Sequence, residues 1–314
     1  MTTNSANTQP AIDLGKSQRL FCGDARDLSV LEDCSVDLVI TSPPYWNLKN
    51  YGGGEGSIGH VGYGDYLEEM NDVWAECFRV AKPGAPLIIN VNSRRHQKRF
   101  YPIAFDIVSH MRDWELHDVN IWYVPNALPQ PNHYIERLLD NKFEYLLVFI
   151  KGGSSAPYKF HKPRVPQKYL HADPRAGKKN AAGRCLGNVL RIPAYRPPNV
   201  RAGNYHVAAY PEELVSFFLE CYTDPDDLIL DPFVGSGTSL KVAGAMGRKG
   251  IGAEINPDFA SLIQDRVNER WEVPDWKTID VLHSSTMKTG GSPRKAQFKA
   301  SGKQEGDLTE LDLR

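Results

Sequence analysis

The sequence predicts an α/β protein built on a mostly parallel, doubly wound sheet. Two observations lead to this fold class. Short apolar runs typical of buried strands alternate with amphipathic helical segments through the first half of the chain. Further on, residues 228–238 form an apolar strand that turns through Gly235 and Gly237 into a helix, as mononucleotide-binding units begin in doubly wound sheets. The 314 residues suffice for one large domain or two small ones.

Composition narrows the class of protein. Charged residues make up 24% of the chain and the formal net charge is −1, which argues against a globally basic nucleic-acid binder. No run approaches the roughly 18 apolar residues of a membrane span, and the start lacks the features of a signal peptide. We therefore expect a cytoplasmic protein without a membrane partner. No Cys-x-x-Cys pair occurs, so we expect reduced thiols and no metal, the cysteines being Cys22, Cys34, Cys77, Cys185 and Cys221.

The first elements lead to an unusual strand end. Residues 1–16 are small and polar, and we expect a disordered arm. Residues 18–22 predict a short strand that ends in Gly23-Asp24, an acidic turn that suits either a cofactor contact or a plain Asx turn. Residues 36–41 then predict a strand covered on both faces. It stops at Ser42-Pro-Pro-Tyr45-Trp46, because paired prolines lack N–H donors and fix φ.

The groups at this strand end suit a planar ring that bears an exocyclic amine. Ser42 offers a hydroxyl acceptor, and the carbonyls of Pro43 and its neighbours are expected to be unpaired acceptors. Tyr45 offers a flat aromatic face on which a ring can stack. The alternative is a proline turn that merely closes a strand, since proline dipeptides commonly mark turns. A second motif is needed to decide between the two.

The following segment continues the alternation of strands and helices. The glycine-rich residues 51–64 predict a loop, which either closes over a substrate or simply connects two elements. Asp65-x-x-Glu68 resembles a capping box at the start of an amphipathic helix that Lys82-Pro-Gly84 ends. Beyond it we expect strands at residues 86–91, 120–124 and 143–151, and a helix at residues 103–111.

Two stretches are candidate nucleic-acid-binding surfaces. A basic run follows strand 86–91 and would either meet phosphates at the ligand-facing edge or form a solvated face; its members are Arg94, Arg95, Lys98 and Arg99. Residues 152–201 hold about a dozen lysines and arginines but one acid, with interleaved aromatics, which is the footprint of a nucleic-acid surface. The alternative is an irregular solvated insertion. The candidate nucleic-acid contacts in this stretch are Lys162, Arg164, Lys168, Lys178 and Lys179.

The second motif favours a site over a proline turn. The strand that ends at Asp231 passes through Phe233 and the two glycines into a helix from Thr238 to Met246. A carboxylate roughly twenty residues later, Glu254, is placed to accept hydrogen bonds from ribose hydroxyls, so the spacing fits an adenosine ligand. Pyrophosphate is less favoured, because the third glycine of the dinucleotide fingerprint and the Gly-Lys-Ser/Thr of a P-loop are missing. A helix capped by Asn256 is expected to follow.

Two motifs, together with the basic insertion between them, resemble one protein family. The motifs are Thr-Ser-Pro-Pro-Tyr upstream and Asp-Pro-Phe-Val-Gly-Ser-Gly-Thr downstream. The family is the bacterial β-class amino-methylating DNA methyltransferases, which use S-adenosylmethionine to methylate cytosine N4 or adenine N6. The resemblance covers roughly residues 18–272. It implies a Rossmann-like class I methyltransferase fold with circularly permuted motif order. The implied parts are a catalytic half (17–151), a target-recognition insertion (152–205), a cofactor-binding half (206–272) and a disordered tail (281–314).

The resemblance also implies roles for individual residues. The flipped target base would be held by Ser42, Pro43, Pro44 and Tyr45. Asp24 would lie by the adenine ring of the cofactor and Glu254 would take the ribose hydroxyls. His206 belongs to a segment that closes the cofactor site in the family, although Val207 replaces the usual proline. The methionine end of the cofactor would meet the glycine motif, whose members are Asp231, Phe233, Gly235, Gly237 and Thr238.

The implied reaction is direct methyl transfer to an exocyclic amine, with Ser42 positioning the amine and the proton leaving after attack. No Pro-Cys dipeptide occurs, so the usual nucleophile of ring-carbon methylation is missing. In the family, Ser before Pro-Pro-Tyr leans towards cytosine N4 and Asp towards adenine N6, which favours cytosine here. The alternatives are a DNA methyltransferase acting on adenine N6, a methyltransferase acting on RNA or protein glutamine, and a non-catalytic DNA-binding relative. Double-stranded DNA is the expected partner of a monomer or homodimer, with a restriction endonuclease as a candidate second partner.

Overall fold

The computed structural model describes residues 11–46, 58–59, 61–127, 138–153, 155–165, 184–194 and 210–270. The described strands are β1 (Ile12–Gly15), β2 (Gln18–Cys22), β3 (Leu38–Thr41), β4 (Pro86–Val91), β5 (Arg94–His96), β6 (Arg99–Tyr101), β7 (Glu115–Tyr123), β8 (Phe143–Ile150), β9 (Arg164–Val165), β10 (Arg184–Cys185), β11 (Val189–Arg191), β12 (Leu228–Asp231) and β13 (Lys249–Glu254). The described helices are α1 (Tyr63–Val80), α2 (Ile103–His110), α4 (Glu212–Tyr222), α5 (Thr238–Ala245), the 3-10 turn η3 (Pro257–Phe259) and α6 (Ala260–Asn268).

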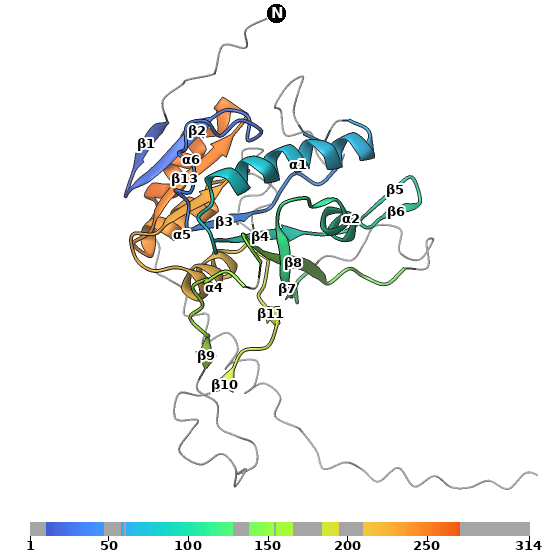
Figure 1. The fold of residues 1–314 in the computed structure, drawn as a ribbon. Helices are drawn as coiled ribbons and strands as arrows, with labels where there is room; N and C mark the ends of the chain where they lie inside the picture. The colour runs from blue at the N-terminus through green and yellow to red at the C-terminus, as the bar shows by residue number, and fades with distance from the viewer. Residues whose placement is uncertain are drawn as a thin grey trace, which may run out of the picture.

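Nine strands form one mixed sheet in the order β1-β2-β13-β12-β3-β4-β8-β7-β11 (Figure 1). Strands β2, β13, β12, β3 and β4 run parallel to one another. Strand β8 runs antiparallel to both of its neighbours, β4 and β7, and β1 runs antiparallel to β2. The prediction of a mostly parallel α/β sheet is therefore confirmed.

The order of the strands differs from their order along the chain. Strands β12 and β13 come late in the sequence, yet they lie between β2 and β3 in the sheet. The carboxyl ends of the five parallel strands share one edge, which we call the carboxyl edge. This edge is where open α/β sheets bind ligands. The glycine motif after β12 consequently lies beside the Ser42–Tyr45 tip after β3, although about 190 residues separate them, as the Thr41–Asp231 hydrogen bond shows.

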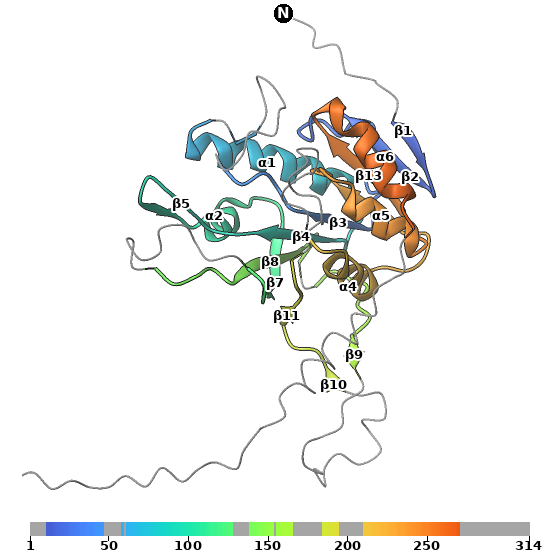
Figure 2. The same ribbon diagram turned by 180° about the vertical axis from the view of Figure 1, so that it is seen from behind.

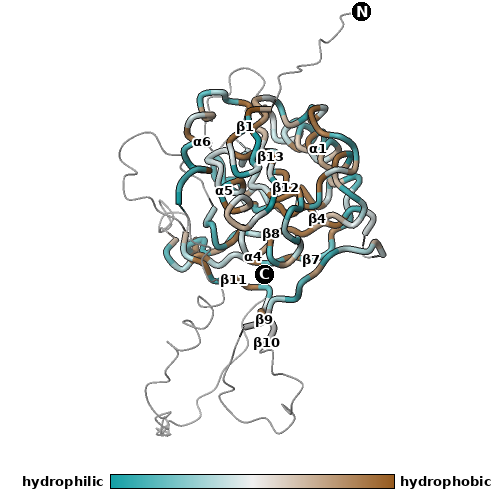
Figure 3. Tube along the Cα trace, turned by 90° about the vertical axis from the view of Figure 1, so that its left-hand side faces the viewer, coloured by the Kyte–Doolittle hydropathy of each residue, from teal (hydrophilic) through white to brown (hydrophobic). Residues whose placement is uncertain are grey.

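Helices cover both faces of the sheet. Helices α1 and α2 lie on one face, and α4, α5 and α6 lie on the other (Figures 1 and 2). Successive residues of a strand point to opposite faces, so Leu87 and Ile89 of β4 pack towards α1 while Ile88 packs towards α4. This two-sided burial explains why the central strands β12, β3 and β4 are mostly apolar, and Figure 3 shows hydrophobic segments inside the molecule.

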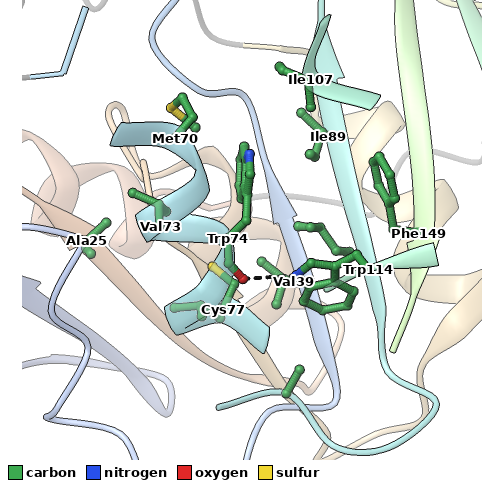
Figure 4. Close-up of a cluster of buried hydrophobic side chains, with 14 of the residues drawn as sticks. Ala25, Val39, Met70, Val73, Trp74, Cys77, Ile89, Ile107, Trp114 and Phe149 are labelled. Atoms are coloured by element: carbon green, nitrogen blue, oxygen red, sulfur yellow. Dashed lines mark hydrogen bonds between the residues drawn. The ribbon is translucent and has the colours of Figure 1, made fainter. Parts of the chain in front are cut away.

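The core under α1 contains two tryptophans joined by a hydrogen bond. Trp114 Nε1 donates to the carbonyl of Trp74 at 3.0 Å, and both side chains are buried (Figure 4). The bond satisfies the indole N–H that burial would otherwise leave without water, so the large rings can be packed inside. Met70, Val73 and Cys77 on the same stripe of α1 complete this face of the helix.

Two expectations about the chain's first part are wrong. Strand β1 lies within the arm that we expected to be disordered through residue 16, because Leu14 is buried against α6 and its carbonyl accepts a bond from Gln264. Helix α1 begins at Tyr63 with Gly62 as N-cap and without a side-chain cap bond, so Asp65 lies inside the first turn and forms no capping box. Strand β7 also begins at Glu115, five residues earlier than expected.

Several other expectations lie outside the described residues. These are the start of the arm (1–10), most of the glycine-rich loop and the tail from residue 281. In the part of the chain that the structure describes, none of the helices is long and apolar enough to cross a membrane. The cysteines with described side chains are free; they are Cys22, Cys34, Cys77 and Cys221.

Candidate active site

The Ser42–Tyr45 tip follows β3 at the carboxyl edge. Pro43 is buried, while Ser42 is partly exposed, and no described group donates a hydrogen bond to the Ser42 hydroxyl or to the Pro43 carbonyl. The carbonyl of Pro44 differs from our expectation, because the hydroxyl of Tyr66 donates to it at 3.1 Å. Tyr66 is fully buried on α1 and needs a partner for its hydroxyl. The tip is thus held from α1, with two acceptors left for a ligand.

Tyr45 extends from this tip across β4 towards β8. Its hydroxyl donates to Glu144 Oε2 at 2.9 Å, and the side-chain amide of Asn90 donates to the same oxygen at 2.7 Å. Desolvation by burial raises the pKa of the Glu144 carboxyl. Sequence reasoning missed Glu144 and Asn90, since neither belongs to a motif and only the register of β4 and β8 brings them to Tyr45.

Trp46 joins the tip to the hairpin formed by β5 and β6. Its ring contacts those of Tyr63, Tyr101 and His96, with centroids 5.0, 4.5 and 5.5 Å away. Arg94 Nη1 donates to the Trp46 carbonyl at 2.6 Å. Arg94 therefore connects the hairpin to the tip, and its predicted contact with DNA stays a prediction.

The remaining members of the basic run are exposed on the hairpin, which projects beside α2 (Figure 1). Arg95 lies over the ring of Phe100, with its guanidinium carbon 5.5 Å from the centroid, and Phe100 is itself 50% exposed. Lys98 lies at the hairpin turn with a left-handed φ of 67°. Cations and an aromatic face presented together at the carboxyl edge suit a nucleic acid.

The glycine motif adopts the tight turn that its sequence predicts. Gly235 and Gly237 have φ values of 50° and 81°, the left-handed region that glycine enters without strain. Gly237 is the N-cap of α5, and a Cβ there would lie 3.1 Å from Ile263 Cγ2. A Cβ on Gly252 of β13 would lie 2.7 Å from Val234 Cβ, so glycine at 252 lets the turn lie directly on the neighbouring strand.

Glu254 closes the turn from the end of β13. Its Oε2 accepts a hydrogen bond from Gly235 N at 3.2 Å, and its Oε1 accepts one from Asn256 N at 3.0 Å. Burial raises the pKa of Glu254 to about 7. Gly23 N donates to the Glu254 carbonyl at 2.9 Å, which places the Asp24 turn beside this carboxylate. Asp24 forms an ion pair with Arg26.

Asp231 connects the glycine motif to the tip. Its buried carboxylate accepts from Thr41 Oγ1 at 2.7 Å and from Phe233 N at 3.0 Å on one oxygen. The other oxygen accepts from Ser239 Oγ at 2.6 Å and from the Tyr210 hydroxyl at 3.0 Å. Four protein donors thus occupy the carboxylate. Asp231 therefore holds the two motifs together, and its predicted contact with the cofactor stays a prediction.

Some predicted contacts lie away from this site or outside the described residues. Lys162 is exposed in the segment that leads to β9. Arg164 belongs to β9, which pairs with β10 in a small separate ribbon. Lys168, Lys178, Lys179 and His206 are not among the described residues. Within the described part of the chain no group of His, Cys, Asp and Glu side chains could hold a metal ion.

The sheet order, the glycine motif after β12 and the acid at the end of β13 define a class I S-adenosylmethionine-dependent methyltransferase. The chain belongs to the DNA methylase family N6_N4_Mtase, whose pattern it matches over residues 36–265. Type II methyltransferase M.HpaI of Haemophilus parainfluenzae is 28% identical over 255 residues, which cover 81% of this chain and 75% of the relative. M.BglII of Bacillus subtilis is also 28% identical, and the match covers 94% of this chain and 81% of that protein.

Solved structures support the same conclusion. TTHA0409 of Thermus thermophilus, assigned as a DNA modification methylase, has a TM-score of 0.55 at 28% identity, covering 80% of this chain and 94% of that chain. Its complex with S-adenosylmethionine gives a TM-score of 0.53 at 27% identity, covering 80% and 93%. The cytosine-N4-specific PvuII DNA methyltransferase shares the fold. It has a TM-score of 0.62 at 20% identity, and the match covers 85% of this chain and 91% of that chain.

S-Adenosylmethionine is the cofactor, and the residues present fit it. The turn through Gly235 and Gly237 offers backbone without side chains at the strand end, so a ligand can approach closely. The Glu254 oxygens bond backbone N–H groups and retain acceptor capacity for ribose hydroxyls. Phe233 lies partly exposed beside the same turn.

Proposed function

We propose that the chain methylates the N4 amine of a cytosine rotated out of duplex DNA. One observation carries the proposal: the Ser42 tip is tied through Thr41 and Asp231 to the glycine motif, so an amine held by the tip would lie beside the cofactor. The base has to leave the stack, because an exocyclic amine cannot reach a methyl donor inside the duplex. Ser42 supports cytosine, since serine before Pro-Pro-Tyr leans towards cytosine N4 in the family that the sequence resembles.

The tip residues would orient the amine for attack. The Ser42 hydroxyl and the Pro43 carbonyl each accept one amino proton, and Tyr45 stacks on the ring, which directs the nitrogen lone pair at the methyl group. S-Adenosylmethionine supplies a methyl group on a positively charged sulfur. The N–C bond forms as the C–S bond breaks, and the sulfur keeps the electron pair. The amine then loses its proton to water, since an unassisted serine hydroxyl is too weak a base to take it beforehand.

Adenine N6 is the second candidate product, because one family covers both amines. Labelled cofactor with unmethylated DNA, RNA and protein as separate substrates tests the substrate class, and digestion of the DNA to nucleosides identifies the product by mass. We expect N4-methylcytosine. N6-methyladenine alone would refute the cytosine assignment, whereas labelling of protein or RNA without DNA would refute a DNA methyltransferase. Binding of S-adenosylmethionine without any transfer would identify a non-catalytic relative.

The biological setting that we propose is restriction-modification. M.HpaI, M.MthZI and M.BglII are type II methyltransferases, and M.BamHII of Bacillus amyloliquefaciens is an orphan methyltransferase. A cognate endonuclease is therefore a partner to test. The basic residues 152–205 are the proposed target-recognition region, because they hold the largest excess of cations in the chain.

Cofactor binding is expected to weaken as the pH falls through 7. The pKa of Glu254 is about 7, and only the ionised carboxylate is the strong acceptor that ribose hydroxyls need. Protonation would therefore oppose binding, and the Kd of S-adenosylmethionine should rise about tenfold between pH 8 and pH 6. Isothermal titration calorimetry at both pH values measures the change.

The matched control for this prediction is Glu254→Gln, which keeps the shape but cannot ionise. This variant should bind S-adenosylmethionine more weakly at pH 8, and its Kd should change much less with pH. Any pH dependence of the Kd that remains comes from titration of the ligand itself. An equal pH dependence in both proteins would show that Glu254 is not the group that titrates.

The exposed cations of the β5–β6 hairpin are expected to contact DNA phosphates. Replacing Lys98 with alanine should weaken DNA binding and reduce the slope of log K against log salt concentration by about 1, because one phosphate contact is lost. Lys249→Ala is the control, since this exposed lysine begins β13 at the opposite edge of the sheet. Equal salt slopes for the two variants would place the DNA elsewhere.

A further inference from the structure

Glu144 is an unusual neighbour for a tip that binds a base. It lies on β8 opposite Trp122 of β7, on the face of the sheet that α4 covers. In the described part of the chain no lysine, arginine or histidine forms an ion pair with it, and desolvation raises the pKa of its carboxyl. Burying a carboxylate without a cation costs stability, so the hydrogen bonds that Glu144 accepts are needed to offset this cost.

Both hydrogen bonds that Glu144 accepts from described side chains fall on one oxygen. The Tyr45 hydroxyl donates to Oε2 at 2.9 Å and the Asn90 side-chain amide donates at 2.7 Å. Donating to Glu144 leaves the Asn90 Oδ1 buried without a partner among the described residues. The polar groups are therefore not arranged to satisfy one another fully. Their arrangement places one oxygen, Glu144 Oε2, within hydrogen-bond distance of the Tyr45 hydroxyl.

Tyr45 connects this oxygen to the tip. Its side chain starts after β3 and ends at β8, two strands further along the sheet. The backbone before it is held by Thr41 through Asp231 and by Tyr66 through the Pro44 carbonyl. The hydroxyl bond fixes the far end of the side chain, so the long axis of the ring is held at both ends. A ring whose axis is held at both ends has less conformational freedom to lose when it stacks on a base.

We propose that Glu144 is a positioning residue that fixes the Tyr45 ring for stacking on the target base, with Asn90 orienting its carboxylate. The inference rests on the proposed function, since it assigns Tyr45 to the base. Glu144 itself acts through the Tyr45 hydroxyl. What its side chain must supply is an acceptor oxygen at this place, and a negative charge is not required.

A double-mutant cycle tests this role. Single-turnover transfer of tritiated methyl groups to unmethylated plasmid DNA is measured at saturating cofactor for Tyr45→Phe, Glu144→Ala and the double variant. Each single change removes the same hydrogen bond and should slow transfer about tenfold. The double variant should be no slower than the slower single one. Losses that multiply to about a hundredfold would overturn the proposal, because the two side chains would then act independently.

Two further variants separate positioning from general stability. Glu144→Gln keeps an oxygen that can accept both bonds and should transfer within about threefold of the natural chain. A loss as large as that of Glu144→Ala would overturn the proposal. Val148→Ala, on the same strand and face, creates a cavity and should lower the melting temperature without slowing transfer.

The outcomes for the two proposals are distinct. If the natural chain labels no DNA, the proposed function fails. If it labels DNA but Tyr45→Phe transfers at the same rate, only the role of Glu144 fails. Tyr45→Phe removes one hydroxyl and no apolar packing, so it also provides the test in the event that Glu144→Ala does not fold.

Discussion

Replacing Ser42 with alanine is expected to slow methyl transfer by about a hundredfold while leaving the fold intact. Removing one oriented polar group from a reacting centre typically costs about two orders of magnitude in rate. Stability should barely change, because the Ser42 hydroxyl has no hydrogen bond from a described group that the substitution would break. Single-turnover transfer to unmethylated DNA and thermal melting measure the two effects.

Ser42→Asp is the matched control for this change. The carboxylate again supplies an acceptor at the same place, so we expect more transfer than from Ser42→Ala. Identification of the methylated nucleoside for the natural chain and for Ser42→Asp shows whether this residue also selects the base. Unchanged transfer in Ser42→Ala would show that the amine is oriented by other groups.

Replacing Asp231 with alanine is expected to destabilise the protein by about 4 kcal/mol, since four donors inside the sheet edge lose their acceptor. These donors are the Thr41, Ser239 and Tyr210 hydroxyls and the Phe233 N–H. For a domain of this size the loss corresponds to a melting temperature about 10 °C lower. Methyl transfer should fall as well, because Thr41 no longer connects the tip to the glycine motif. Calorimetry and the transfer assay measure both.

Asp231→Asn separates hydrogen bonding from charge. One amide oxygen can still accept from Thr41 and Phe233, and the hydroxyls of Ser239 and Tyr210 can rotate to accept from the amide N–H groups. Burial raises the pKa of Asp231, which means that the site does not favour the charged form. The asparagine variant should therefore lose only about 1 kcal/mol. A loss equal to that of Asp231→Ala would show that the negative charge itself is needed.

Much of the fold follows from local patterns in the sequence. Buried parallel strands are covered on both faces, so residues 86–91 are apolar except for Asn90, and the predicted strand coincides with β4. The turn from Asp231 to Thr238 is equally local, because glycines with left-handed φ are required within a few residues of the strand end. Strand β13 and its terminal Glu254 could also be predicted from a short stretch of sequence.

Local patterns were misleading where burial depends on a distant partner. The arm looked too polar to fold, but Leu14 is buried against Ile263 and Val267 of α6, some 250 residues further along. The basic run was treated as one group, which would either meet phosphates or form a solvated face, and local pattern gave no way to tell its members apart. The structure separates Arg94, which is bonded to Trp46, from the exposed Lys98.

The sequence by itself determined the class of the protein, its cofactor and the two motifs, because each motif needs particular residues within one strand and its turn. Only the tertiary structure decided how the motifs are joined. The bonds Thr41–Asp231 and Tyr45–Glu144 link residues 190 and 99 positions apart. Such contacts depend on strand order and register, which bring together side chains that no local pattern relates.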